Sequence, residues 1–301
     1  MSQDKPKTPD ILCIGSVLWD VIGRSASHMR VGSDVPGRIT RLPGGVAMNI
    51  AMTLARFGLT PGLLTTIGQD AEGNELMTEA DRMGMITRYV YRSEDLPTDV
   101  YMAIEGANGL VAAIADAHSL EAAGPKILRA LENGDLGTAE KPFTGPVALD
   151  GNLTEELLQQ IATSPLFAKA DLRVAPASPG KANRLLALLG HPSATLYVNL
   201  EEAGLLCQTT FENATSAVHA LCKRGARRVL VTNGGETAAE GTAGDVIEAT
   251  PPAVMVTRVT GAGDTFMAAH IASEVQGMDR TAALTRALNA AATYVSGDTP
   301  L

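Results

Sequence analysis

Residues 257–269 read T-R-V-T-G-A-G-D-T-F-M-A-A and join a β-branched run to a stretch of small residues that favours a helix. Gly261, Ala262 and Gly263 would present backbone N–H groups where that helix begins, an arrangement that binds anions such as phosphate. Asp264 follows them, and its carboxylate would repel a phosphate unless the reaction needs a base there. The stretch therefore predicts phosphoryl transfer to a hydroxyl group. The alternative is a tight turn followed by a capping aspartate.

The composition narrows the classes of ligand. The chain has 301 residues, 45% of them apolar, and a net charge of -9. Without a cationic excess the protein gains nothing from counterion release on nucleic acid, so we exclude nucleic acid and anionic membranes as partners. The length allows one large core, with or without a small appendage, and small-molecule ligands are favoured.

Cysteine, histidine and the hydropathy pattern exclude further classes. Cys13, Cys207 and Cys222 are unclustered, and the five histidines show no i, i+4 pairing, so neither a disulfide framework nor a zinc site is indicated. The first residues lack the apolar segment of a signal peptide, and no run approaches the ~18 apolar residues that span a bilayer. We expect a cytoplasmic protein.

Buried apolar runs alternate with helical patterns along most of the chain. Such alternation is typical of a mostly parallel sheet with helices on both faces, so we expect a three-layer α/β/α core. The predicted strands are 10–16, 63–67, 87–91, 146–150, 171–175, 194–198 and 228–232, with a short β region near 237–250. The predicted helices follow the double glycine to Phe57 and then cover 71–83, 119–132, 154–163, 181–189 and 211–224.

Two segments are predicted to form a small β lid outside this core. Residues 21–43 are polar and glycine-containing, and residues 98–116 read as a hairpin around G-A-N-G. We therefore assign residues 1–20, 44–95 and 119–301 to the core and residues 21–43 and 96–118 to the lid. Lids of this kind close over a substrate and exclude water. The exposed edges of such a sheet leave a homodimer through the lid open.

Polar residues gather where the predicted strands end. Because the carboxyl ends of parallel strands meet at one edge of the sheet, these residues form a candidate site. Asp20 follows the first strand, and Gly44, Gly45 and Asn49 open the first helix. Later strands are followed by Asp150 and Asn152, Ser178 and Lys181, Asn199 and Glu202, and residues 232–235. The alternatives are a solvated loop for Asp20, a plain turn for the two glycines and a solvent-exposed Lys181.

The double glycine with Asn49 and the stretch 259–264 resemble the two signatures of the ribokinase-like, or PfkB, family of carbohydrate and nucleoside kinases. The likeness covers nearly the whole chain, and the order of the two signatures also fits. Within the family it is strongest to the pseudouridine kinases, on residues 37–51, 98–104, 150–152 and 259–264. The resemblance implies a ribokinase-like fold and an ATP- and magnesium-dependent kinase that phosphorylates a primary hydroxyl of a ribosyl substrate. The best candidate acceptor is the 5′-hydroxyl of pseudouridine.

The resemblance also assigns roles to matching residues. Asp264 would be the general base, and the amides of Gly261, Ala262 and Gly263 would bind the transferred phosphoryl group. Three further groups are implied. They are Asp20, Gly44, Gly45 and Asn49 for the sugar hydroxyls; Thr232, Gly234, Asn289 and Lys181 for the nucleotide; and Asn199 and Glu202 for magnesium through water. The need for a monovalent cation stays open.

Four positions depart from the family pattern, and other functions compete. Arg258 replaces an acid, Leu18 an asparagine, Tyr197-Val198 a Lys-Pro pair and Ala175 an acid. These departures bear on nucleotide preference and magnesium handling but leave Asp264 in place. Within the family, ribokinase, fructokinase and purine-nucleoside kinase are the alternatives. A dinucleotide-dependent oxidoreductase would need G-x-G-x-x-G after the first strand, which is missing, and a non-catalytic nucleoside-binding module would bind substrate without turning over ATP.

Overall fold

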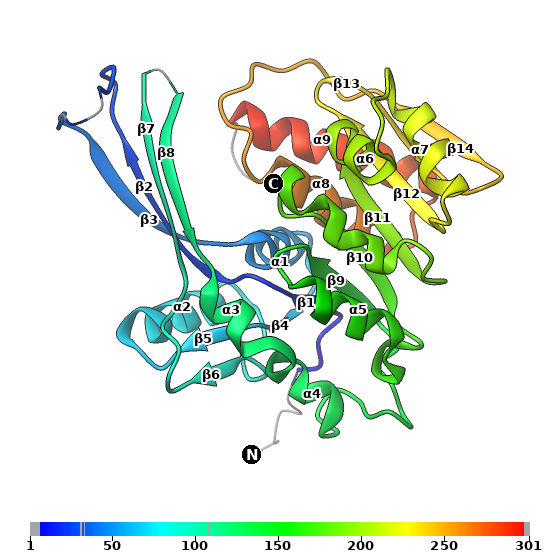
Figure 1. Cartoon of the computed structure of the whole chain (residues 1–301), viewed down its shortest axis with the longest axis horizontal. Coiled ribbons are helices and arrows are strands. Elements are labelled where there is room, and N and C mark those ends of the chain that lie inside the picture. Colours follow the sequence, from blue (N-terminus) through cyan, green and yellow to red (C-terminus); the bar gives the residue numbers. More distant parts are fainter. Residues whose placement is uncertain (1–6, 31, 33, 108, 298–301) are drawn as a thin grey trace.

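The computed structural model describes residues 7–30, 32, 34–107 and 109–297. Its centre is an eight-stranded sheet in the order β14-β13-β12-β11-β10-β9-β1-β4 (Figure 1). The strands from β12 to β4 pair in parallel, and β13 and β14 add an antiparallel edge. The strands are β1 (Ile11–Ile14), β4 (Pro61–Leu64), β9 (Pro146–Asp150), β10 (Asp171–Ala175), β11 (Ala194–Asn199), β12 (Arg228–Asn233), β13 (Glu236–Gly241) and β14 (Val246–Ala249).

Helices cover both faces of this sheet because its strands are apolar on both sides. In β1, Leu12 and Ile14 face one hydrophobic cluster, and Ile11 and Cys13 face the other. The first cluster includes residues of α3 (His118–Ala123), α4 (Arg129–Glu132), α5 (Glu155–Thr163), α6 (Leu200–Cys207), α7 (Ala214–Lys223) and the 3₁₀ helices η1 (Gly124–Leu128), η2 (Pro165–Phe167) and η3 (Pro179–Leu188). The second includes residues of α1 (Val46–Arg56), α2 (Ala71–Arg82), α8 (Ala262–Val275) and α9 (Arg280–Ser296).

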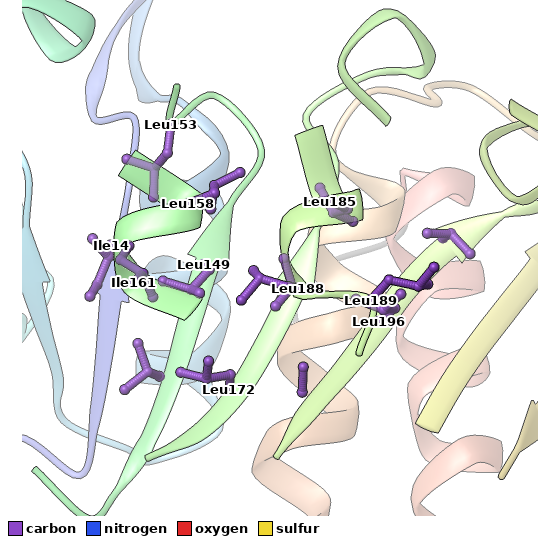
Figure 2. Packing of buried hydrophobic residues seen from close by; sticks show 14 of the residues in the cluster. Ile14, Leu149, Leu153, Leu158, Ile161, Leu172, Leu185, Leu188, Leu189 and Leu196 are labelled. Carbon is purple, nitrogen blue, oxygen red and sulfur yellow. The ribbon is translucent and has the colours of Figure 1, made fainter. Parts of the chain in front are cut away.

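Figure 2 shows the first of these clusters from close by. Leucines of α5 and η3 face the apolar side chains of the parallel strands, such as Leu149 and Leu196. Full burial of one such side chain contributes ~1.5–3 kcal/mol. The core therefore fixes where each strand ends, and with it the positions of the polar residues that follow the strands.

A second sheet of four strands extends from the core (Figure 1). Its order is β3-β2-β7-β8, with β2 (Leu18–Arg24), β3 (Arg38–Gly44), β7 (Val100–Gly106) and β8 (Gly109–Asp116). The β2–β7 pair is parallel and the other two pairs are antiparallel. All of β8 is exposed. A further pair joins β5 (Thr66–Gly68) and β6 (Tyr91–Ser93).

The predicted fold class, a three-layer α/β/α core with a mostly parallel sheet and a small second sheet, is confirmed. The division into core and lid domains stays a prediction. Asn108, which we predicted to lie in the hairpin turn, is outside the described residues, as are the first six and the last four residues. Within the described part of the chain, no helix is long and apolar enough to cross a bilayer.

Several predicted elements were wrong in detail. The helix expected over 119–132 is divided into α3, η1 and α4, because Gly124 has a φ of 52° and Pro125 lacks an N–H. The helix expected over 181–189 is the 3₁₀ helix η3, which begins at Pro179. The strand expected over 87–91 forms only at β6, which covers Tyr91–Ser93.

Candidate active site

The parallel strands β1, β9, β10, β11 and β12 direct their carboxyl ends to one edge of the central sheet. The α1 and α8 helices pack against each other next to this edge. Their first turns bring together the two glycine-containing stretches of the sequence. Asn49 of α1 donates from Nδ2 to Oδ2 of Asp264 in α8 over 2.9 Å.

Asp264 stands in the first turn of α8 in a partly buried position. Its pKa is raised to about 7, mainly by burial and also by the nearby carboxylates of Asp150, Asp20 and Glu202, while the hydrogen bond from Asn49 acts to lower it. A carboxylate with a pKa near neutral pH can both accept and release a proton under working conditions.

The turn before Asp264 uses glycine for a steric reason. Gly261 has a φ of 87°, and a Cβ there would lie 2.6 Å from the hydroxyl oxygen of Tyr294. The amide of Ala262 donates to the carbonyl of Val259 over 3.1 Å. Because the first amides of a helix have no carbonyl partner within the helix, the amide of Gly263, in the first turn of α8, is available to an anion.

Asp20 and the glycine pair lie close together in the second sheet. Asp20 belongs to β2, and Gly44 is the last residue of the neighbouring strand β3. A Cβ on Gly44 would lie 2.1 Å from Oδ2 of Asp20, and a Cβ on Gly45, whose φ is 92°, would lie 2.5 Å from the carbonyl oxygen of Ser16. Position 45 therefore requires glycine, and a side chain at position 44 would displace the Asp20 carboxylate. Burial raises the pKa of Asp20 to about 6.

A buried polar network forms the floor of the candidate site between β1 and β10. Asp150 is fully buried and accepts hydrogen bonds of 2.7 Å from the amide and the hydroxyl of Ser16. Asn152 donates to the hydroxyl of Ser16, and its own Oδ1 accepts from Lys181 on η3. Lys181 therefore lies beside the end of β9, while Thr232 is the last residue but one of β12, with β10 and β11 between those strands.

Asn199 and Glu202 form a capping box at the start of α6. Each side chain accepts a hydrogen bond of 2.8 Å from the backbone amide of the other residue. Glu202 is buried, and burial raises its pKa to about 7, with the Asn199 amide opposing and Glu201 adding to the shift. The pair thus has a structural role that the sequence analysis did not predict.

The donor set of the site fits a hydrated divalent cation. Within the described ranges, Asp20, Asp150, Glu202 and Asp264 form no ion pair with a basic side chain. The described residues also contain no group of three or more His, Cys, Asp or Glu side chains that could hold a metal directly. Magnesium keeps several waters and takes oxygen atoms from substrate phosphates, so a carboxylate such as Glu202 suits it without a protein cage.

The other residues that we predict for the nucleotide site lie on β12, in the turn after β12 and on α9. Thr232 lies near the end of β12, Gly234 has a φ of 56° in the following turn, and Asn289 is exposed on α9. No hydrogen bond joins these three residues in the described structure. Ser16 and Tyr294 were not predicted, because a serine after a strand and a tyrosine in an alanine-rich helix carry no distinctive signal.

Known proteins that resemble this chain in sequence include kinases. The model of the pfkB family of carbohydrate kinases matches residues 8–298. An uncharacterized sugar kinase of Escherichia coli (strain K12), YeiI, is 30% identical over 269 residues, which cover 88% of this chain and 72% of the relative. The pseudouridine kinase of the same organism is 28% identical over 276 residues, covering 89% of this chain and 84% of the relative.

Solved structures also resemble the chain. A carbohydrate kinase from Agrobacterium tumefaciens is 26% identical with a TM-score of 0.80, over 96% of this chain and 94% of that one. An Arabidopsis thaliana ribokinase complexed with ribose and ATP is 23% identical with a TM-score of 0.79, over 98% of this chain and 95% of that one. The second likeness shows the fold alone.

Proposed function

Because the chain belongs to the pfkB family of carbohydrate kinases, and so is a phosphotransferase with an alcohol group as acceptor, we propose that it transfers the γ-phosphate of ATP to a primary hydroxyl of a ribosyl substrate. Our preferred acceptor is the 5′-hydroxyl of pseudouridine. The observation that carries the proposal is the position of Asp264, bonded to Asn49 at the start of α8 with its pKa raised to about 7.

In this proposal Asp264 takes the proton from the acceptor hydroxyl as its oxygen attacks the γ-phosphorus. The amide of Gly263 and its neighbours at residues 261 and 262 donate to the oxygens of the transferred group. Such donors are fixed before the reaction and stabilise charge where it develops, which typically contributes ~2.7–4 kcal/mol per donor. The Ala262 amide must exchange the Val259 carbonyl for the phosphoryl oxygen.

Magnesium, when bound with ATP, neutralises charge on the phosphates. We assign Asn199 and Glu202 to its water ligands, since Glu202 lacks a basic partner among the described residues and adds to the raised pKa of Asp264. Thr232, Gly234, Asn289 and Lys181 remain our proposed nucleotide-site residues. Of these four residues, Lys181 has a partner outside the nucleotide site, because it donates a hydrogen bond to Asn152 of the buried polar network.

The sugar would be held by Asp20, Gly44, Gly45 and Asn49. The second sheet would act as the lid, with the core and lid boundaries as predicted from the sequence. Pseudouridine is preferred because the pseudouridine kinase of Escherichia coli matches 89% of this chain. Homodimerisation through the lid and a cytoplasmic location remain predictions.

The first experiment measures ATP consumption with magnesium and pseudouridine, uridine, adenosine, ribose or fructose. The expected result is turnover with pseudouridine, identified as the 5′-phosphate by mass spectrometry and ³¹P NMR, and its loss in Asp264→Asn. Preference for ribose, fructose or adenosine would keep the mechanism and reject the acceptor. Binding of a nucleoside without turnover of any acceptor would reject the enzyme and favour a non-catalytic module. Replacing potassium by tetramethylammonium in the same assay measures dependence on a monovalent cation.

A further inference from the structure

The segment that leads into the phosphate-binding turn has few anchors. Residues 252–260 are exposed, and three of their apolar side chains are largely open to solvent, Met255 at 81%, Val256 at 60% and Val259 at 71%. No strand pairing holds this segment in the described structure. The positions of Gly261 and of the amides after it therefore depend on the contacts that hold residues 257–260.

The anchors come from one place, the last turn of α9. The amides of Thr257 and Arg258 both donate to the carbonyl of Val295, over 2.8 and 3.3 Å, and the hydroxyl of Thr257 donates to the same oxygen. In the reverse direction, the hydroxyl of Tyr294 donates to the carbonyl of Thr260 over 2.9 Å. That carbonyl belongs to the residue directly before Gly261.

Arg258 makes two contacts with Tyr294 on the last turn of α9. Its Nε donates to the carbonyl of Tyr294 over 2.7 Å, and its guanidinium lies 3.9 Å from the centre of the Tyr294 ring. Carbonyls at the end of a helix carry partial negative charge, so a fixed cation there is stabilising. The ring is thus held between Arg258 and the turn, and Gly261 leaves room for its hydroxyl.

Tyr294 also borders the reactive groups. Burial raises the pKa of its hydroxyl, and the charges of Asp264 and Asp20 act in the same direction while Arg258 opposes them. The hydroxyl therefore lies within the electrostatic reach of the proposed base. In the described structure this hydroxyl donates to the Thr260 carbonyl and not to Asp264, so the contact that it shows is with the turn.

We propose that Arg258 and Tyr294 are positioning residues that lock the phosphate-binding turn to the end of α9. The inference rests on the proposed function and assigns to Arg258 a role for which the family pattern has no counterpart at that position. With the lock in place, the amides of residues 261–263 and the carboxylate of Asp264 keep one geometry before substrate binds. A misplacement of about 1 Å in such groups can cost ~100-fold in rate.

Two single variants measure separately what the Tyr294 hydroxyl and the Arg258 guanidinium contribute to kcat. Tyr294→Phe removes the hydrogen bond to Thr260 and keeps the ring, and Arg258→Ala removes the cation and keeps Tyr294. For each variant we expect kcat to fall about tenfold, because the turn amides and Asp264 lose part of their fixed geometry, with the KM of acceptor and ATP within about twofold. The double variant should lose less than the product of the two single losses, since both act through one turn. Arg258→Lys should restore only part of kcat.

The control is a second arginine–tyrosine pair with the same chemistry. Arg88 lies 4.5 Å from the ring centre of Tyr89 and donates to its hydroxyl, on the segment between α2 and β6. Arg88→Ala and Tyr89→Phe should leave kcat unchanged. If Tyr294→Phe and Arg258→Ala lower the melting temperature but leave kcat at the wild-type value, the pair is merely structural and the proposal is wrong.

Hydrogen exchange tests the lock without any catalysis. The amides of residues 257–264 should exchange faster in Tyr294→Phe and Arg258→Ala than in the wild type, and those of α5 should not change. If the wild-type protein phosphorylates none of the acceptors, the proposed function fails, and this measurement still decides on the lock. Unchanged exchange in both variants would overturn the proposal whatever the activity.

Discussion

The two ends of α8 carry acids with opposite electrostatics. Asp264 in the first turn has no basic partner among the described residues, and burial with three nearby carboxylates raises its pKa to about 7. Glu274 near the last turn contacts Arg173 and Arg228, which lower its pKa although burial acts to raise it. One helix thus presents an uncompensated charge at the carboxyl edge of the sheet and a compensated charge at the opposite edge.

The compensated end belongs to a larger ionic network. Glu240 of β13 is fully buried, and it pairs with Arg228 and Arg280 while His270 lies 3.3 Å away. Burial alone would raise the pKa of Glu240, but these partners lower it to about 2. Paired buried charges stabilise one arrangement of the fold, whereas buried charges without a partner cost stability and are kept where the chemistry needs them.

The contrast between Asp264 and Glu274 is tested most strongly by changing each of these two acids to its amide. Asp264→Asn should lower kcat by at least ~10³, because the amide cannot accept the proton. The same change should raise stability at pH 8, because the stability from a raised pKa is fully present below the unfolded pKa and is lost as pH rises through about 7. Kinetics and urea unfolding at pH 8 and pH 4 measure both effects.

Glu274→Gln is the matched variant at the other end of α8. It should keep kcat within about threefold and lower the free energy of unfolding, because Arg173 and Arg228 lose a counter-charge. Equal losses of activity in both variants would show that Asp264 acts through helix integrity and would contradict its role as base.

The next largest effect is expected at Glu240. Glu240→Gln leaves Arg228 and Arg280 short of a buried counter-charge, so the free energy of unfolding should fall by ~3–5 kcal/mol at pH 7. Because the folded pKa is lowered, this contribution is present above the unfolded pKa and lost as pH falls through about 2. Urea unfolding measures it, with the exposed Glu236 of the same strand, changed to Gln, as control. A loss of the same size in the control would reject the pairing argument.

The pH dependence of the reaction should follow the uncompensated acids. Asp264 and Glu202 have pKa values raised to about 7 and Asp20 to about 6, so kcat/KM should fall as pH is lowered from 8 to 6. Since these groups interact, the apparent pKa values belong to the cluster. Initial rates at constant magnesium measure the profile. A rate that stays constant from pH 8 to pH 5.5 would contradict a base with a pKa near 7.

The sequence was most informative where burial on both faces decides the structure. The strands predicted over 146–150 and 171–175 form at those residues because continuous apolar runs allow no other placement. The helix predicted over 119–132 failed because Gly124 and Pro125 select 3₁₀ geometry, which apolar spacing does not reveal. Local periodicity thus identified the layers but not every helix type.

The candidate site was predictable only in part. The two glycine-containing stretches predicted Asp264 and Asn49 separately, and the fold brings them into hydrogen-bond contact. The network around Ser16 and the lock by Tyr294 depend on contacts between distant segments, which no local pattern encodes. Arg258, which the sequence marked only as a departure from the family pattern, gains an explanation from its contact with α9.

The smallest effect is expected at two residues of the second sheet, Tyr101 and Met102. Tyr101 pairs with Asp20 across β2 and β7, and the Asp20 charge adds to the raised pKa of Tyr101, so the two side chains share one face. Met102 is the next residue in the strand and points to the opposite face, 46% exposed. Changing either residue to Ala should alter acceptor preference more than turnover, with Tyr101→Ala changing the ratio of kcat/KM for pseudouridine over uridine more than Met102→Ala does.

The size of this effect follows from what a lid contact can discriminate. One apolar or hydrogen-bonding contact to a base changes relative rates by ~10-fold or less when water can replace it. Competition between the two nucleosides in one reaction measures the ratio directly. An equal loss with every acceptor in Tyr101→Ala would place Tyr101 with the catalytic groups and contradict a lid that selects the base. If neither variant changes the ratio of kcat/KM for pseudouridine over uridine, the base must be recognised elsewhere, and the buried network at Asn152 and Lys181 is the next candidate. The same competition assay on Lys181→Met would then test that network.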